Sequence, residues 1–272
     1  MSATDGGERN GQAKPLIEVN QLTRIFGRGP GAVTAVNAAT FSVPERHIVT
    51  IVGESGSGKS TLSRMLLRLL EPSSGSFTLE GKDVTKLRGG HLKSYWQEVQ
   101  AVFQDPFSSF NQFFPIRRLL EDATGVLKQK PSASERQHRM EEALRHVGLN
   151  LDVLDKHPHQ LSGGQRQRVM MARALMLRPR VLIADEATSM LDASLRANIL
   201  NLLDDIRKEL GMTILFVTHD LGQASYIADY VLVMYKGDIV EQGDADRVLW
   251  NPQHEYTQRL LADVPKLHEV SA

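Results

Sequence analysis

The segment Gly53–Ser60 constrains the fold of this chain most strongly, because it reads Gly-Glu-Ser-Gly-Ser-Gly-Lys-Ser and fits the pattern G-x-x-x-x-G-K-[ST]. The apolar run His47–Val52 precedes it, and Lys59–Leu70 follows with leucines at helical spacing. Glycines let successive backbone N–H groups turn toward phosphate oxygens, and the N-terminus of the helix adds a partial positive charge. An ordinary glycine-rich turn is the alternative, but strand and helix flanks favour a phosphate-binding loop. Lys59 would then reach the outer phosphates and Ser60 would hold magnesium.

Composition narrows the class of protein. The chain has 272 residues, 41% of them hydrophobic, which suffices for one large domain or two small ones. Because 32 basic residues balance 32 acidic ones, we expect no overall basic field for nucleic acid, although a local patch stays open. The absence of cysteine excludes disulfides and cysteine-ligated metal sites and suits a reducing compartment. No apolar run reaches the ~18 residues that cross a bilayer, and polar residues 1–15 predict a flexible lead-in rather than an export signal.

The remaining patterns predict two sheets and a helical insertion. Short runs at 17–22, 39–43 and 47–52 suit an N-terminal sheet. Buried strands at 99–103, 181–184 and 213–218 alternate with helices at 162–177 and 199–210, as in a parallel sheet. The stretch 115–157 is mostly helical in pattern, with Ser132 as the N-cap of a helix over 133–147. Closing strands at 231–235 and 238–242 precede a helical tail from residue 244.

Polar residues follow three of these predicted strands. Asp185 and Glu186 follow the strand at 181–184, Gln104 follows the strand at 99–103, and His219 follows the strand at 213–218. Open α/β folds bind ligands at the carboxyl edge of the sheet, where these side chains would gather. Asp185 would orient magnesium, Glu186 would align or deprotonate the attacking water, and Gln104 and His219 would support phosphoryl transfer. Each residue alone also has a purely structural interpretation, so their joint placement carries the prediction.

With the pieces in this order, the chain resembles the nucleotide-binding subunit of ATP-binding-cassette (ABC) transporters over Ile17–Pro265, and Leu161–Gln165 matches the signature of that family residue for residue. The resemblance implies an α/β fold: a P-loop NTPase (RecA-like) core with an N-terminal antiparallel β subdomain and a helical insertion subdomain. It places the family's motifs in chain order as Walker A at Gly53–Thr61, the Q-loop at Gln104, Walker B at Val181–Asp185, the catalytic carboxylate at Glu186, the D-loop at Ser189–Asp192 and the switch histidine at His219. Met190 in the D-loop departs from the family's more usual Ala.

The resemblance also implies which residues form the ATP site. The implied catalytic residues are Glu186, His219, Gln104 and Lys59, and the implied magnesium ligands are Ser60, Gln104 and Asp185. The implied nucleotide contacts are Phe26, Gly53, Glu54, Ser55, Gly56, Ser57, Gly58, Lys59, Ser60, Thr61, Gln104, Asp185, Ser162, Gly163, Gly164, Gln165, Asp192 and His219. Phe26 would stack on adenine, with a core phenylalanine as the alternative. Because a long helical stretch separates the signature from Lys59, Ser162 and its glycines would act on ATP held by a second subunit.

Three features resemble the oligopeptide, dipeptide and nickel importer group: the extended Q-loop Phe103–Asn111, the sequence Pro158-His159-Gln160, and the tail motif Asn251–Thr257. Gln112 and the missing cysteine cluster depart from that group. The implied function is an ATPase that powers uptake of an oligopeptide or dipeptide, with an oligosaccharide left open. The implied partners are a second ATPase subunit (identical or different), two permease subunits and an extracytoplasmic solute-binding protein, with ATP and Mg²⁺ as cofactors and no nucleic acid.

The implied location is peripheral, at the cytoplasmic face of the plasma (inner) membrane. The expected domains are a lead-in at 1–15, an ATP-binding domain at 16–250 with a helical subdomain at about 107–177, and an importer-type tail at 251–272. Two other hypotheses stay open: a soluble cassette ATPase acting on ribosomes or DNA, and a module that binds ATP without hydrolysing it. The four phenylalanines after the Q-loop suit a groove for a permease helix and a protein core equally; they are Phe107, Phe110, Phe113 and Phe114.

Overall fold

The computed structural model describes residues 15–105 and 110–262 of the chain. Residues 1–14 of the expected lead-in, Phe107, and the last part of the expected tail lie outside these ranges. Pro15, expected to end the lead-in, instead begins the first strand. Within the described ranges, no helix combines the length and the apolar character that a membrane crossing requires.

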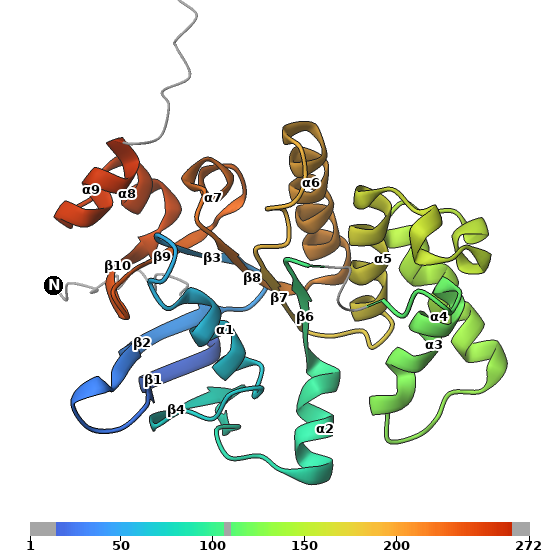
Figure 1. Ribbon diagram of the computed structural model, residues 1–272, viewed down its shortest axis with the longest axis horizontal. Coiled ribbons are helices and arrows are strands. Elements are labelled where there is room, and N and C mark those ends of the chain that lie inside the picture. The colour runs from blue at the N-terminus through green and yellow to red at the C-terminus, as the bar shows by residue number, and fades with distance from the viewer. Residues whose placement is uncertain (1–14, 106–109, 263–272) are drawn as a thin grey trace, which may run out of the picture.

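The elements alternate between strands and helices along most of the chain (Figure 1). The strands are β1 Pro15–Phe26, β2 Val33–Pro44, β3 Ile48–Val52, β4 Ser74–Leu79, β5 Lys82–Asp83, β6 Val99–Phe103, β7 Val181–Asp185, β8 Thr213–Thr218, β9 Tyr230–Tyr235 and β10 Asp238–Asp244. The α-helices are α1 Lys59–Leu66, α2 Gly89–Glu98, α3 Ile116–Ala123, α4 Ala133–His146, α5 Gly163–Leu175, α6 Ala193–Leu210, α7 Leu221–Ile227, α8 Ala245–Trp250 and α9 Glu255–Ala262.

The strands form two separate sheets. One is antiparallel, in the order β2-β1-β4-β5, and the other runs β10-β9-β3-β8-β7-β6 with only β10 antiparallel to its neighbour. The expectation that the run at 47–52 joins the N-terminal sheet is therefore wrong, because β3 pairs with β8 and β9 in the parallel sheet. All five residues of β3 are buried, as in a strand covered on both faces, whereas β1 and β2 alternate buried and exposed positions.

Side chains alternate between the two faces of each parallel strand, and on each face they pack into one of two main hydrophobic cores. In β8, Leu215 and Val217 pack with α1 and the antiparallel sheet, whereas Ile214 and Phe216 pack with the helices on the other face. α1 therefore lies between the two sheets, and α3, α4 and α5 gather beyond β6 (Figure 1). This arrangement places the segment between β3 and α1 at the carboxyl edge of the parallel sheet.

Several predicted boundaries shift for local reasons. The helix expected over 59–70 ends at Leu66, and Arg68 follows with a positive φ of 57°, which breaks the helical path. The helix expected to start at Ile199 begins at Ala193, because the Asp192 carboxylate accepts a hydrogen bond from the Leu195 N–H at 3.0 Å. Ser132 caps α4 as predicted, accepting from the Glu135 N–H at 3.1 Å.

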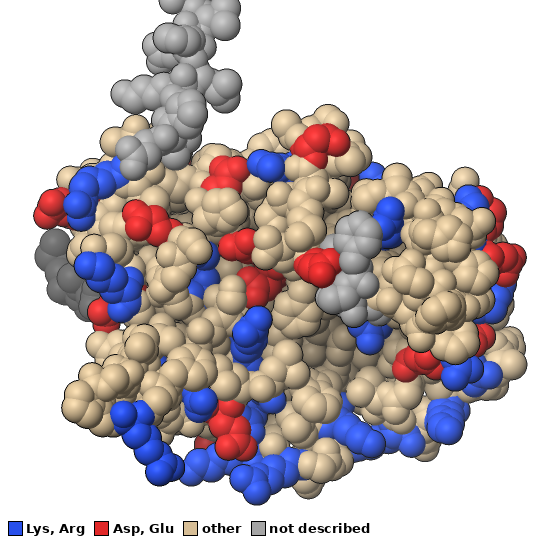
Figure 2. Space-filling model, viewed as in Figure 1, with Lys and Arg blue, Asp and Glu red and all other residues tan. Residues whose placement is uncertain are grey.

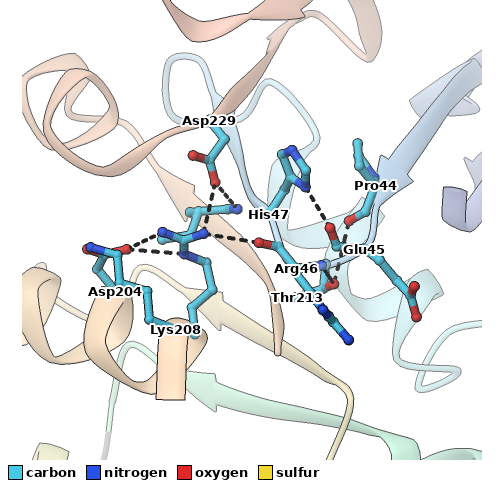
Figure 3. Close-up of polar contacts among 10 residues, drawn as sticks. Pro44, Glu45, Arg46, His47, Asp204, Lys208, Thr213 and Asp229 are labelled. Atoms are coloured by element: carbon cyan, nitrogen blue, oxygen red, sulfur yellow. Dashed lines mark hydrogen bonds and ion pairs between the residues drawn. The ribbon is translucent and has the colours of Figure 1, made fainter. Parts of the chain in front are cut away.

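Polar contacts hold the amino edge of the parallel sheet together (Figure 3). The Asp229 carboxylate accepts from the Ile48 N–H at 2.7 Å, so the starts of β3 and β9 are joined. The Thr213 hydroxyl accepts from the Arg46 N–H at 2.7 Å, which joins the β2–β3 turn to β8. This edge is opposite to the one that carries the phosphate loop. Figure 2 shows both signs of charge interspersed over one face, with Lys and Arg gathered along the edge formed by the antiparallel sheet and α2.

Candidate functional site

The phosphate loop can adopt its path only with glycine at two positions. Gly53 and Gly58 have φ values of 150° and 108°, which side-chain-bearing residues rarely adopt. A Cβ on Gly53 would lie 2.2 Å from the Met234 carbonyl oxygen, and one on Gly58 would lie 2.2 Å from the Ala35 carbonyl oxygen. The loop therefore packs directly on the backbones of β2 and β9, which fixes where its N–H groups point.

Lys59 is buried at the end of this loop, with 4% of its surface exposed. Its ammonium donates to the carbonyl oxygens of Gly53 at 2.7 Å and Glu54 at 2.8 Å. Burial lowers the pKa of Lys59, although the negative charges of Glu186, Asp185 and Glu54 oppose that shift. The Lys59 ammonium is therefore held against the backbone carbonyl oxygens at the start of the phosphate loop.

Ser60 and Asp185 meet beside Lys59. The Ser60 hydroxyl donates to Asp185 Oδ1 at 3.3 Å, and Asp185 is only 6% exposed. Burial raises the pKa of Asp185, the Ser60 hydrogen bond works against this shift, and the charge of Glu186 adds to it. A hydroxyl and a carboxylate are oxygen ligands that Mg²⁺ accepts. Among the described residues no cluster of three His, Asp or Glu could hold a metal by itself, so phosphate oxygens of a substrate would complete the ligand set.

Glu186 and His219 face each other at the same sheet edge. His219 Nδ1 lies 3.5 Å from Glu186 Oε1, and the Glu186 side chain is about one-fifth exposed. Glu186 has a φ of 50°, a conformation that costs about 1–2 kcal/mol in a residue with a side chain. The Glu186 N–H donates to the Val217 carbonyl at 2.9 Å, and the Ser189 hydroxyl donates to the Glu186 carbonyl at 2.9 Å. These bonds hold the Glu186 backbone in this conformation despite the strain.

Two further predicted residues lie at separate positions around this centre. Gln104 follows β6 directly, and because Phe103 pairs with Asp185, it emerges at the same edge as Glu186. Phe26 ends β1 and is 39% exposed, so it is not the core phenylalanine that was the alternative. The Arg24 guanidinium lies 4.6 Å from the centroid of the Phe26 ring.

The signature residues begin α5 and are not brought to the phosphate loop of the same chain. Ser162 and Gln165 form a reciprocal cap: the Ser162 hydroxyl accepts from the Gln165 N–H at 3.2 Å, and Gln165 Oε1 accepts from the Ser162 N–H at 3.0 Å. Ser162 and Gly163 are exposed. α5 packs against α3, α4 and β6, whereas α1 packs against β2, β7 and β8 (Figure 1).

The sequence did not predict a network of polar side chains that lies next to Glu186 and His219. The Thr188 hydroxyl donates to Gln223 Oε1 at 2.5 Å, and Gln223 Nε2 donates to Asp220 Oδ2 at 3.0 Å. Asp220 also accepts from the Gly222 N–H at 2.8 Å, which caps α7 directly after His219. An Asp just ahead of a helical run is a recognisable cap signal, whereas Thr188 and Gln223 carry no pattern that marks them.

An apolar groove opens beside β6, away from the phosphate loop. Its volume is about 340 Å³, and its lining includes Leu69, Trp96, Phe103 and Arg173. The phenylalanines after the Q-loop divide between the two interpretations: Phe110 is buried in the core, while Phe113 and Phe114 are 88% and 51% exposed.

Comparison with known proteins identifies the class that this fold and site define. Residues 36–189 match the family described as ABC transporter. The chain is 40% identical over 254 residues to an oligopeptide transport ATP-binding protein of Streptococcus mutans, covering 93% of this chain and 82% of that one. It is also 40% identical over 266 residues to a dipeptide transport ATP-binding protein of Lactococcus lactis, covering 96% and 84%. A solved dimeric ATP-binding cassette in a post-hydrolysis state, bound to ADP and Pi, superposes with a TM-score of 0.75 at 27% identity, covering 84% of this chain and 98% of that chain.

The chain therefore belongs to the ABC transporter family. The predicted fold class, a P-loop NTPase core with an antiparallel β subdomain and a helical insertion, is confirmed, and so is the predicted enzyme class, an ATPase.

Proposed function

We propose that this chain is the ATP-hydrolysing subunit of an importer for oligopeptides or dipeptides. One observation carries the solute class: relatives named for oligopeptide and dipeptide transport are 40% identical to nearly the whole chain. The extended Q-loop Phe103–Asn111 and the tail motif Asn251–Thr257 agree with that assignment.

The arrangement at the carboxyl edge of the sheet supports a division of chemical roles. The loop from Gly53 to Thr61 would bind the phosphates through its N–H groups, and Lys59 would balance their charge. Magnesium, held by Ser60, Asp185 and Gln104, would neutralise developing negative charge on the phosphate oxygens.

Glu186 would orient the attacking water and accept its proton at a carboxylate oxygen. His219, whose Nδ1 lies 3.5 Å from Glu186 Oε1, would donate a hydrogen bond to the transferred phosphoryl group. Phe26 would stack on the adenine ring, since it is exposed at the end of β1 and the Arg24 guanidinium lies over one side of its ring.

The proposed complete site needs two copies of a cassette. The Ser162 hydroxyl and the Gly163 and Gly164 N–H groups stand at the N-terminus of α5, which suits an anion but lies among the helices beyond β6. A second subunit, identical or related, would bring these groups to the ATP held by the first, and Asp192 at the start of α6 would join the seam. ATP would then hold the two subunits together until it is hydrolysed.

The groove beside β6 would receive a helix of a membrane permease, and exposed Phe114 lines a neighbouring pocket that shares Asp122 and Arg173 with the groove. Two permease subunits and a solute-binding protein would complete the importer, with this chain peripheral at the cytoplasmic face of the membrane. Within the chain we propose an ATP-binding domain at 16–250, a helical subdomain at about 107–177, and an importer-type tail at 251–272.

The test of the proposed chemistry is Glu186→Gln, which keeps the size of the side chain and removes the base. We expect ATPase activity to fall by about 10²-fold or more while an ATP-bound dimer persists, measured by phosphate release and size-exclusion chromatography. Glu209→Gln, a surface change of the same kind, serves as the control. Normal hydrolysis by Glu186→Gln would contradict the role of this carboxylate.

The solute is tested by purifying the complete transporter with its binding protein and identifying the bound solute by mass spectrometry. Recovery of peptides supports the proposal. Recovery of an oligosaccharide instead would refute the peptide assignment and leave the ATPase chemistry intact.

A further inference from the structure

The tail motif reaches back to the ATP site. Tyr256 lies in the first turn of α9 and is 3% exposed. Its hydroxyl oxygen accepts a hydrogen bond from the backbone N–H of Glu54 at 3.1 Å, although the two residues are 202 positions apart. Glu54 is the second residue of the phosphate loop, so a side chain of the tail contacts the loop backbone directly.

Tyr256 is held rigidly in the position from which it makes this contact. Its ring lies against Tyr235 of β9, with 4.1 Å between the ring centroids and 30° between the planes. The Glu241 carboxylate of β10 accepts from the N–H groups of Gln253 at 2.8 Å and His254 at 3.1 Å. The turn that leads into α9 is therefore fixed to the edge strand, and Tyr256 has little freedom to move away.

The charge on Glu241 agrees with this anchoring role. Burial by itself would raise the pKa of Glu241, but the donated hydrogen bonds outweigh burial and lower it. The carboxylate is thus stabilised in its ionised form, in which both of its oxygens accept hydrogen bonds. His254 Nδ1 accepts from the Tyr256 N–H at 3.1 Å, which fixes the first turn of α9 a second time.

The peptide group between Gly53 and Glu54 joins Tyr256 to Lys59. The N–H of this planar group donates to Tyr256, and its carbonyl oxygen accepts from the Lys59 ammonium at 2.7 Å. Rotation of the peptide plane would move both ends together, so the tyrosine hydroxyl limits where the ammonium can be held. On the far side of the loop, the Gly237 N–H donates to the Ser57 carbonyl at 2.9 Å.

We propose that Tyr256 is a positioning residue of the ATP site: its hydroxyl fixes the Gly53–Glu54 peptide and, through it, the Lys59 ammonium. This inference rests on the proposed nucleotide site, and it assigns the tail motif a role in positioning the phosphate loop. A loop whose amides are already oriented loses less conformational freedom when it binds phosphate, so the contact strengthens ATP binding. A role in folding alone would leave ATP affinity and the exchange of the loop amides unchanged when the hydroxyl is removed.

Tyr256→Phe tests the proposal, because it keeps the buried ring and removes only the acceptor. With the purified full-length chain, competition of ATP against a fluorescent ATP analogue should give ~2–10-fold weaker binding, as expected for one lost hydrogen bond. Hydrogen exchange of the segment Gly53–Gly58, followed by mass spectrometry without nucleotide, should speed up by a similar factor. Glu241→Gln, which weakens the anchor of α9, should shift both measurements in the same direction.

Tyr226→Phe is the matched control, since the Tyr226 hydroxyl also makes one hydrogen bond, to Asn201 at 2.6 Å on the exposed side of α7. Wild-type ATP affinity and loop exchange in Tyr256→Phe would overturn the proposal, and so would equal weakening by both tyrosine variants. If the loop exchanges faster in Tyr256→Phe but the wild-type chain binds no ATP, the result supports the contact between Tyr256 and the loop and contradicts the proposed nucleotide site. The two failures are therefore distinguishable.

Discussion

At the residue scale, the site buries ionisable side chains whose charged forms are destabilised by burial. Asp185 and Lys59 are 6% and 4% exposed, and their pKa values shift in opposite directions, both because burial disfavours the charged form. Glu186 adds backbone strain beside them. Proteins commonly accept such costs where substrate charge will later be balanced, which agrees with the proposed ATP site.

Asp185→Asn should raise the melting temperature near neutral pH while it abolishes most ATPase activity. The pKa of Asp185 is raised in the folded protein, so the folded state binds a proton more tightly than the unfolded state, and the ionised carboxylate destabilises the fold above that raised pKa. The gain in melting temperature should shrink as the pH falls through the raised pKa of folded Asp185, and vanish below the ordinary carboxyl pKa, where both states are protonated. Differential scanning calorimetry across pH measures this, and a variant that is less stable at neutral pH would contradict it.

At the element scale, two helices share the same kind of cap but stand in different places. Ser132 caps α4 and Ser162 caps α5, each by accepting an N–H hydrogen bond three residues on, at 3.1 and 3.2 Å. The local physics of the two serines is therefore similar. α4 faces no predicted ligand, whereas α5 begins with the signature of the family.

Ser132→Ala and Ser162→Ala form a matched pair that separates capping from ATP chemistry. Each should lower the free energy of unfolding by about 0.5–2 kcal/mol, the usual cost of losing an N-cap, measured by urea denaturation. Only Ser162→Ala should also lower the ATPase activity of the dimer, by about tenfold or more, because it removes a hydroxyl proposed to contact phosphate. Equal ATPase activity in the two variants would argue against the shared site.

At the scale of the whole molecule, Arg180 connects the two sheets at the amino end of β7. Its guanidinium pairs with Glu45 at 2.5 Å in the β2–β3 turn and with Glu80 at 2.6 Å in the β4–β5 turn. Its backbone N–H donates to the Glu98 carbonyl at the end of α2 at 2.9 Å. The hydrogen bonds to Glu80 and Glu45 raise the pKa of Arg180 and outweigh burial, which lowers it, so Arg180 stays charged at any ordinary pH.

Arg180→Met should destabilise the protein by about 1–2 kcal/mol, a modest value because these pairs are partly exposed. Salt should reduce the difference between variant and wild type, since screening already weakens the pairs in the wild type. ATP affinity should not change, because Arg180 lies at the opposite end of β7 from Asp185. Thermal unfolding at low and high salt, with a parallel ATP titration, measures both effects, and a variant with impaired ATP binding would refute this separation.

The sequence predicted the parts of the site that depend on local pattern. The glycines of the phosphate loop, the capping Ser132 and the polar residues at the carboxyl ends of β6, β7 and β8 or directly after them all stand where the pattern placed them. Assigning the run at 47–52 to the N-terminal sheet failed, because an apolar run fits either sheet and only its pairing with β8 and β9 decides between them.

By itself, the sequence determined the glycine loop, the apolar strands and the helix caps, and predicted from them which residues would bear the chemistry of an ATPase, because each of these features acts over a few neighbouring positions. Only the tertiary structure decided which distant groups meet: Tyr256 with the phosphate loop, and Arg180 with Glu45 and Glu80. The physical reason is that such contacts depend on how packed elements bring together residues far apart in the chain. A buried tyrosine or a surface arginine carries no local pattern that names its partner.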